Sequence, residues 1–100
     1  MTAFDAIAVG RRVLGVEAEA LKTLSGALGD SFSQAVEALF QAKGRIACTG
    51  IGKSGLVARK IASTLASTGS PALFVHPAEA SHGDLGMIGP GDVILALSKS

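Results

Sequence analysis

Three short apolar runs, separated by glycine-containing turns, constrain the fold of this chain more than any other feature. The runs are residues 45–49, 72–75 and 93–97. Residues 54–68, between the first two runs, carry apolar side chains at helical spacing. Continuous apolar strands that alternate with helices are typical of a parallel sheet covered on both faces. The sequence therefore predicts an α/β fold, in which helices pack on both faces of a parallel sheet.

The predicted helix and the last strand should both contribute apolar side chains to the core. The larger apolar residues of the helix recur at helical spacing with alanines between them, and we expect them to face the sheet: Val57, Ile61 and Leu65. Because residues 93–97 are apolar throughout, the last strand should be buried on both of its faces.

Two further helices are predicted ahead of the first strand. Residues 3–28 repeat apolar side chains at helical spacing, and a second pattern of this kind runs to Phe40. Ser31 and Gln34 have the spacing of a capping box, in which two side chains satisfy exposed amides at the start of a helix. We therefore assign residues 1–43 to N-terminal helices.

The charge and composition of the chain exclude several classes of function. Nine Lys and Arg against eight Asp and Glu leave a net charge of +1, so no strong positive field attracts nucleic acid or an anionic membrane. No run of about 18 apolar residues is present, which argues against a membrane-spanning segment. The lone Cys48 excludes an intramolecular disulfide and favours a reducing compartment. We expect a cytoplasmic protein that binds neither nucleic acid nor membrane.

Residues 49–55, Thr-Gly-Ile-Gly-Lys-Ser-Gly, form the most informative local segment. A strand that enters a glycine turn and then a helix gathers backbone N–H groups around one point, and the helix dipole adds to their attraction for an anion. Phosphate is the expected guest, although a tight turn of this kind also occurs without any ligand. A single phosphate would bind the loop amides and the Ser54 hydroxyl, with Lys53 reaching toward the ligand.

Two nucleotide-binding patterns fit the same loop less well. The dinucleotide spacing of glycines is present at Gly50, Gly52 and Gly55. That pattern also needs an acidic residue for the ribose, where this chain has Val75-His76-Pro77. The nucleoside-triphosphate loop needs a leading glycine where this chain has Ala47. A phosphosugar site is the interpretation that remains.

Both histidines of the chain lie in one segment, residues 76–84, together with Glu79 and Asp84. In an α/β sheet, the loop that follows the carboxyl end of a strand lies on the ligand side. His76 and His82 can donate, accept or transfer protons there near neutral pH. As a metal motif the segment is weak, because the two histidines lack helical ligand spacing. The simpler alternative is a locally packed histidine with carboxylates that cap turns.

Four motifs follow one another along the chain: residues 49–55, Ala-Ser-Thr-Gly-Ser-Pro at 66–71, a segment at 75–87 that contains His-Gly-Asp-Leu-Gly, and Leu-Ser-Lys-Ser at 97–100. Together they resemble the sugar isomerase (SIS) domain, and more narrowly the arabinose-5-phosphate isomerases. The resemblance implies a flavodoxin-like three-layer sandwich, of which residues 44–100 would be the first half, truncated at the carboxyl end.

The resemblance also implies a reaction, the interconversion of D-ribulose 5-phosphate and D-arabinose 5-phosphate. This step feeds the synthesis of 3-deoxy-D-manno-octulosonate for lipopolysaccharide. The implied partners are a sugar phosphate and further copies of the chain in a homo-oligomer, with no required cofactor. A non-catalytic SIS module that binds a phosphosugar shares the glycine loop, so that loop does not separate the two functions. Lys53 and the His-Gly-Asp segment favour the enzyme.

The resemblance implies roles for individual residues. Lys53 matches a catalytically relevant lysine, which would stabilise the negative charge of an enediol. His82 is expected to open the sugar ring or to contact hydroxyl groups, and zinc is expected at His76 as an inhibitor. In this family the other catalytic groups, a base among them, come from later in the chain. The implied substrate-binding residues are Gly52, Ser54, Gly69, Ser70, His76, His82, Ser98 and Ser100.

Overall fold

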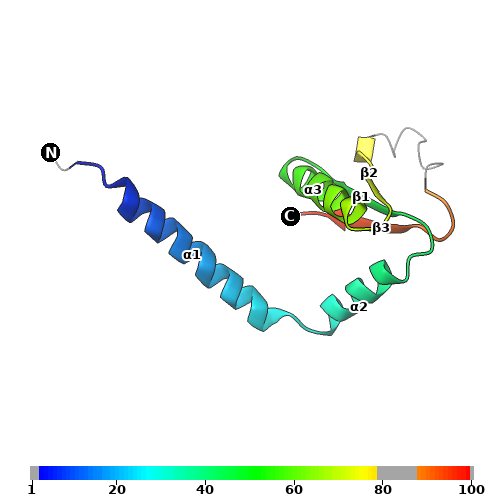
Figure 1. Cartoon of the computed structure of the whole chain (residues 1–100), viewed down its shortest axis with the longest axis horizontal. Coiled ribbons are helices and arrows are strands. Elements are labelled where there is room, and N and C mark those ends of the chain that lie inside the picture. Colours follow the sequence, from blue (N-terminus) through cyan, green and yellow to red (C-terminus); the bar gives the residue numbers. More distant parts are fainter. Residues whose placement is uncertain (1–2, 79–87, 100) are drawn as a thin grey trace. The chain divides into compact units, whose positions relative to one another are not determined.

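The computed structural model describes residues 3–78 and 88–99, and the chain divides into two compact units, Met1–Gln34 and Ala35–Ser100. Helices and strands follow in the predicted order (Figure 1): α1 (Ala6–Ala27), α2 (Asp30–Phe40), β1 (Ile46–Gly50), α3 (Lys53–Ser67), β2 (Ala72–Phe74) and β3 (Val93–Leu97). Each boundary lies within a few residues of the predicted one, because glycine or proline flanks most of these elements.

The first unit contains α1 and the start of α2. The carboxylate of Asp5 caps α1 by accepting a hydrogen bond from the amide of Ala8 at 3.0 Å. Aliphatic side chains recur along the helix, and none of its residues is buried. Among the residues that the structure describes, no helix combines the length and the apolar character needed to cross a membrane.

The predicted capping box at the start of α2 is wrong. The helix begins at Asp30, one residue before Ser31, so Ser31 lies in the first turn and is not the N-cap residue. The amide of Phe32 donates instead to the carbonyl of Gly29 at 3.0 Å. The negative charge of Asp30 in the first turn is favourable at the positive end of the helix dipole, which stabilises this earlier start.

The second unit is built on a parallel sheet with the strand order β2-β1-β3. Ile46 of β1 is paired with Ala72 on one side and with Val93 on the other. The first strand in sequence is therefore the central one, and the next two strands lie on either side of it (Figure 1). Because all three strands are parallel, their carboxyl ends share one edge of the sheet.

The core of the second unit lies between β1 and α3 and consists of small side chains. Cys48, Ala58 and Ala62 are buried together with Ile46. Leu39 of α2 packs against the same cluster. Burial raises the pKa of the Cys48 thiol, which therefore stays protonated and packs as a small apolar group.

The predicted inward face of α3 is correct for two of its three large residues. Ile61 and Leu65 pack against the core, but Val57 is 53% exposed, so its predicted inward position is wrong. The buried residues of α3 are Gly55, Ala58 and Ala62. The helix turns its smallest residues toward the sheet because small side chains allow the backbones to approach closely.

Strand β3 is half-buried, which differs from the prediction of burial on both faces. Leu95 and Leu97 pack against the core cluster with α3, whereas Ile94, on the other face, is 55% exposed. Alternate residues of a strand point to opposite faces, so covering one face leaves the other open. Within the described residues, α3 covers the face that carries Leu95 and Leu97.

An aspartate fixes the entry into the two paired strands β1 and β3. The carboxylate of Asp92 accepts hydrogen bonds from the amides of Arg45 at 2.6 Å and Gly89 at 2.8 Å. The guanidinium of Arg45 lies 3.7 Å from the same carboxylate. The hydrogen bond from Arg45, then that from Gly89, holds the pKa of Asp92 below its usual value. A Cβ at Gly44 would overlap this carboxylate, so no other residue fits there without a shift.

Candidate functional site

The glycines of the turn between β1 and α3 have two different tasks. A Cβ at Gly50 would lie 2.9 Å from the amide nitrogen of Gly55, and a Cβ at Gly55 would lie 2.6 Å from the carbonyl oxygen of Gly50. These two glycines allow the strand end to touch the first turn of the helix. Gly52, with φ of 62°, takes the left-handed conformation that reverses the chain at the N-cap of α3.

The turn presents the positive end of α3 at the carboxyl edge of the sheet. Gly52 has no side chain that could cap the helix. Its backbone carbonyl accepts a hydrogen bond from the amide of Leu56 at 3.2 Å. The amides at the very start of a helix have no acceptor within the helix. The start of α3 therefore offers backbone donors and a positive dipole end to an anion.

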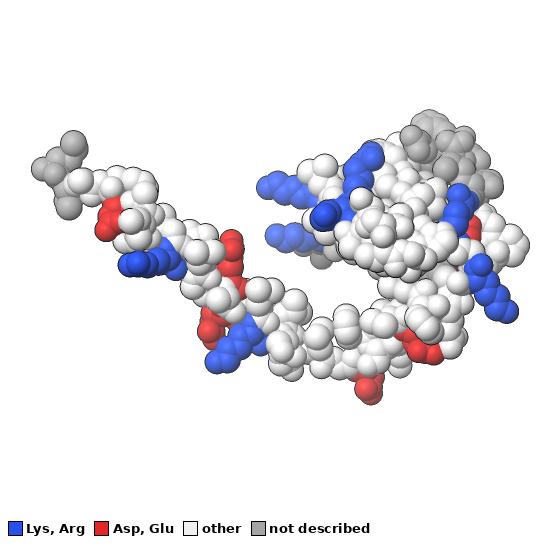
Figure 2. Space-filling view, viewed as in Figure 1, with Lys and Arg blue, Asp and Glu red and all other residues white. Residues whose placement is uncertain are grey.

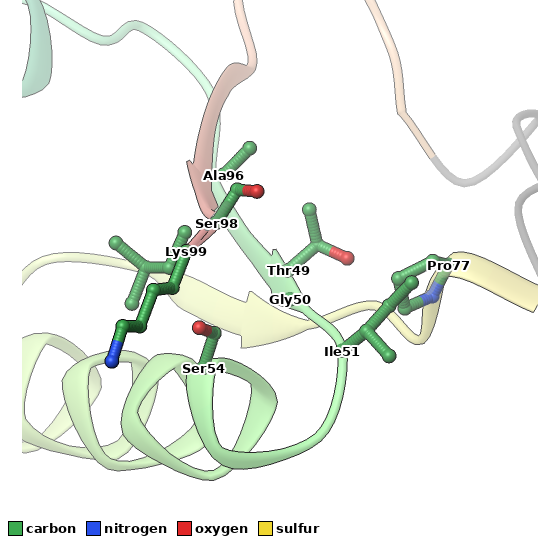
Figure 3. Close-up of a pocket in the computed structure, with 9 residues that line it drawn as sticks. Thr49, Gly50, Ile51, Ser54, Pro77, Ala96, Ser98 and Lys99 are labelled. Atoms are coloured by element: carbon green, nitrogen blue, oxygen red, sulfur yellow. The ribbon is translucent and has the colours of Figure 1, made fainter.

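A pocket of about 410 Å³ opens where β1 and β3 end and α3 begins (Figure 3). Its polar side chains come from all three elements or the residues next to them: Thr49, Ser54, Ser98 and Lys99. The hydroxyl of Thr49 donates to the carbonyl of Val75 at 2.5 Å and joins the ends of β1 and β2. Three of these side chains carry a hydroxyl group and one carries an ammonium group, the other described lining residues are glycine or apolar, and no carboxylate is among them, which suits an anionic ligand.

A smaller hollow of about 190 Å³ borders the same glycine turn and includes Gly52 and His76 in its lining. The guanidinium carbon of Arg59 lies 4.0 Å from the centre of the Phe74 ring, and this ring meets the imidazole of His76 edge to face at 6.4 Å. The Nδ1 of His76 accepts a hydrogen bond from the amide of Ala78 at 3.1 Å. Because Nδ1 is the acceptor in this contact, Nε2 is the ring nitrogen left to meet a ligand.

The part of the chain that forms the sheet, α3 and the pocket also identifies its family. Residues 38–100 match the SIS domain. The chain belongs to the SIS domain family. The matched range contains every described residue that lines the 410 Å³ pocket. The family predicted from the four sequence motifs is confirmed.

Two curated relatives of this SIS chain have similar sequences. It is 55% identical over 96 residues to the arabinose 5-phosphate isomerase KdsD of Pseudomonas aeruginosa, a match that covers 96% of this chain and 29% of the relative. It is 48% identical over 97 residues to KdsD of Escherichia coli, which covers 97% of this chain and 30% of the relative. The chain therefore spans less than a third of the length of these relatives.

A solved structure, Escherichia coli CFT073 c3406 in complex with arabinose 5-phosphate, has a similar fold. It matches this SIS chain with a TM-score of 0.88 and 38% identity, covering all of this chain and 53% of the other. The predicted α/β class is confirmed, and the described helices and sheet correspond to the N-terminal part of the SIS domain.

The structure brings together some of the site residues that the sequence predicts. Ser54 and Ser98, distant in sequence, line the same pocket, with Ser54 on α3 and Ser98 directly after β3. Lys53 is the first residue of α3 and precedes Ser54, but it is not among the residues that line this pocket. Its catalytic role stays a prediction.

Other predicted residues lie elsewhere or outside the described part of the chain. Gly69 and Ser70 line a separate hollow of about 230 Å³ next to Pro71, which precedes β2. Residues that precede a parallel strand lie at the edge opposite to those that follow it, so these two are remote from the glycine turn. His82 and Ser100, as well as the carboxylates of Glu79 and Asp84, lie outside the described residues.

Zinc at His76 was tested against the groups around it. The Nδ1 of His76 already accepts a hydrogen bond, which leaves Nε2 as its second ring nitrogen. Across residues 3–78 and 88–99, no three His, Cys, Asp or Glu side chains gather in a way that would hold a metal ion. The described residues do not form a zinc site by themselves, so zinc at His76 stays a prediction.

Two polar side chains of the pocket were missed by the sequence analysis. Thr49 and Lys99 line the 410 Å³ pocket beside the predicted serines. Lys99 stands between the serines of the Leu-Ser-Lys-Ser motif and directly follows an apolar strand, which is the signal that would have identified it. Thr49 gave a weaker signal, since a threonine at the end of a strand is common without any ligand.

Proposed function

We propose that the protein is an aldose–ketose isomerase of phosphosugars, which interconverts D-ribulose 5-phosphate and D-arabinose 5-phosphate. The observation that carries this proposal is the meeting of Ser54 and Ser98 in one pocket at the start of α3. Hydroxyl donors, helix amides and a positive dipole end together suit a phosphate group. The curated relatives named arabinose 5-phosphate isomerase support this choice of sugar, and with it a place in the supply of 3-deoxy-D-manno-octulosonate for lipopolysaccharide.

The reaction moves a proton between C1 and C2 of the sugar through an enediol, and it needs a base for the carbon and an acid near the oxygen. With the phosphate held by the pocket residues, the reacting carbons C1 and C2, at the other end of the sugar, lie away from these residues. Lys53 is assigned to stabilise the developing negative charge, and His82 to ring opening or hydroxyl contact. The described pocket residues include no carboxylate or imidazole, and the proposal takes the base from later in the full-length protein, as the family resemblance implies.

A second function, binding of a phosphosugar without catalysis, is favoured by one observation. The described lining of the pocket provides anion-binding groups and no group that acts as a base for a C–H proton. A sensor or regulatory SIS module would need only this binding function. The two functions differ in turnover, not in phosphate affinity.

Four further expectations belong to the proposal. The protein works in the cytoplasm as a homo-oligomer and requires no metal cofactor, and zinc inhibits it at His76. Sedimentation of the full-length protein tests the oligomeric state. Activity that survives exhaustive chelation and falls on titration with zinc would agree with the expected metal behaviour, and activity lost on chelation would contradict it.

The decisive experiment measures conversion of D-ribulose 5-phosphate by the full-length protein and by Lys53→Ala and His82→Ala. We expect each substitution to lower kcat by a factor of about 100 or more, as for loss of an electrostatic or proton-transferring group. Lys60→Ala is the matched control, because Lys60 is an exposed lysine of the same helix α3. Full turnover in both variants would refute the assignment of these residues, and binding of the sugar phosphate without any turnover in the native protein would favour the sensor.

A further inference from the structure

Lys99 is the charged residue of the 410 Å³ pocket. It directly follows Ser98 at the end of β3, and both line the pocket with Ser54 of α3. In the view of Figure 3 the Lys99 side chain extends from the end of β3 toward α3, on the side where Ser54 lies. Lys99 is therefore part of the lining of the pocket that the proposed function gives to the phosphate.

The ammonium group of Lys99 is not neutralised by the described part of the protein. The ion pair found there joins Arg45 to Asp92, and none involves Lys99. Other basic residues near the glycine turn are placed differently: Lys53 does not line the pocket, and Arg59 lies over the ring of Phe74. Within the described residues, no carboxylate therefore competes with a ligand for Lys99.

The other donors of the pocket are neutral and match a single negative charge better than two. Serine hydroxyls and helix amides donate hydrogen bonds, and the helix end adds a partial charge of about +0.5. A phosphate monoester carries nearly two negative charges at neutral pH. A neutral site binds the second charge poorly, whereas a nearby ammonium group binds it with a strong charge-assisted hydrogen bond.

We propose that Lys99 is the specificity-determining residue of this pocket, which makes it select the dianion of a phosphate monoester over a singly charged ester of the same shape. The inference rests on the proposed function, because it assigns the sugar phosphate to this pocket. The inference also gives the two lysines different roles. Lys99 binds the phosphate equally in the ground and transition states, and Lys53 acts on the reacting carbons. Loss of Lys99 should therefore raise KM and leave kcat nearly unchanged.

The test compares two unreactive ligands on the full-length protein by calorimetric titration. D-Arabinitol 5-phosphate lacks the carbonyl group and cannot isomerise, and D-arabinitol 5-sulfate has the same shape with one negative charge. We expect Lys99→Gln to raise the Kd of the phosphate by about tenfold and that of the sulfate by about twofold to threefold. Lys99→Arg should restore most of the preference, and Lys60→Gln, at an exposed lysine of α3, should leave both values unchanged.

The outcomes separate this inference from the proposed function. Equal losses for the two esters in Lys99→Gln, large or small, would overturn the selection of the dianion and leave the isomerase proposal intact. A fall in kcat with an unchanged KM would also overturn it, because it would place Lys99 at the reacting carbons. A native protein that binds neither ester and converts no ribulose 5-phosphate would overturn both proposals.

Discussion

Gly50 and Gly55 touch backbone to backbone where the central strand meets the helix. This contact places the end of β1 directly under the first turn of α3, so the amides of that turn reach the edge of the sheet. Gly52 adds the one left-handed residue that the turn needs. The shape of the anion site therefore depends on three residues that have no side chain, and the chemistry depends on their neighbours.

Gly50→Ala should destabilise the protein by about 1–3 kcal/mol, as expected for a methyl group forced against fixed backbone. The added Cβ would lie 2.9 Å from the backbone of Ser54 and Gly55. Urea unfolding at equilibrium measures the loss. Gly10→Ala is the control, because no atom lies within 4 Å of its Cβ and alanine favours a helix by roughly 1 kcal/mol. Equal stability of the two variants would contradict the close contact.

Asp92 should make folding stability depend on acidity. Its pKa is lowered in the folded protein by the hydrogen bonds from Arg45 and Gly89. A carboxyl group whose pKa is lowered by folding stabilises the folded protein at any pH above its unfolded-state pKa of about 3.9. This stabilisation is lost as the pH falls through the folded-state pKa. We expect Asp92→Asn to be less stable than the native protein at pH 7 and to lose less stability on acidification. The measurement is the free energy of unfolding of both proteins between pH 7 and 3. If the two curves ran parallel over this range, the prediction would be refuted.

At the scale of helices and strands, the local sequence predicted the positions of the elements along the chain better than it predicted their packing. The runs of apolar residues and the flanking glycines and prolines predicted all the described helices and strands. The inward face of α3 was only partly predicted, because Ala58 and Ala62 are buried where the larger Val57 was expected. How closely a helix approaches a sheet depends on the facing strand, which periodicity does not report. The strand order and the pairing partners of β1 likewise required the structure.

The pocket joins two elements, so its hydroxyl groups should contribute from both sides. We expect Ser54→Ala and Ser98→Ala each to raise the Kd of D-arabinitol 5-phosphate by about fivefold to tenfold, the usual cost of a hydrogen bond to a charged group. Ser67→Ala is the matched control, because Ser67 ends the same helix at the opposite end and bonds to the carbonyl of Thr64. An effect of only one of the two serines would mean that the phosphate does not bridge α3 and the end of β3.

At the scale of the whole molecule, charge is nearly balanced and is unevenly distributed. The chain has a net charge of +1, and on the visible face of the second unit Lys and Arg outnumber Asp and Glu (Figure 2). Composition predicted the absence of a strong field, but it did not indicate that one lysine lines the pocket. The placement of Lys99 depends on β3 pairing beside β1, a contact between residues far apart in sequence. That is why the glycine turn was predicted from the sequence and the cation beside it was not.

Because the anion site is local, its affinity should depend only modestly on salt. We expect the Kd of D-arabinitol 5-phosphate to rise by roughly threefold when salt increases tenfold, since screening acts on few charges at short range. Titrations of the full-length protein at two salt concentrations measure this change. A rise of more than about tenfold would point to a broad electrostatic field instead of a local site.

The central position of the first strand has a consequence for how this site can vary. From β1 the chain adds one strand on one side and the next strand on the other, so the connections diverge on leaving the sheet. This is a topological switch point, where the divergence itself opens a crevice at the carboxyl ends of the strands. The crevice is thus a property of chain connectivity and persists when individual loop residues change. New ligand preferences can then arise from the segments after β2 and β3, while the scaffold beneath them stays the same.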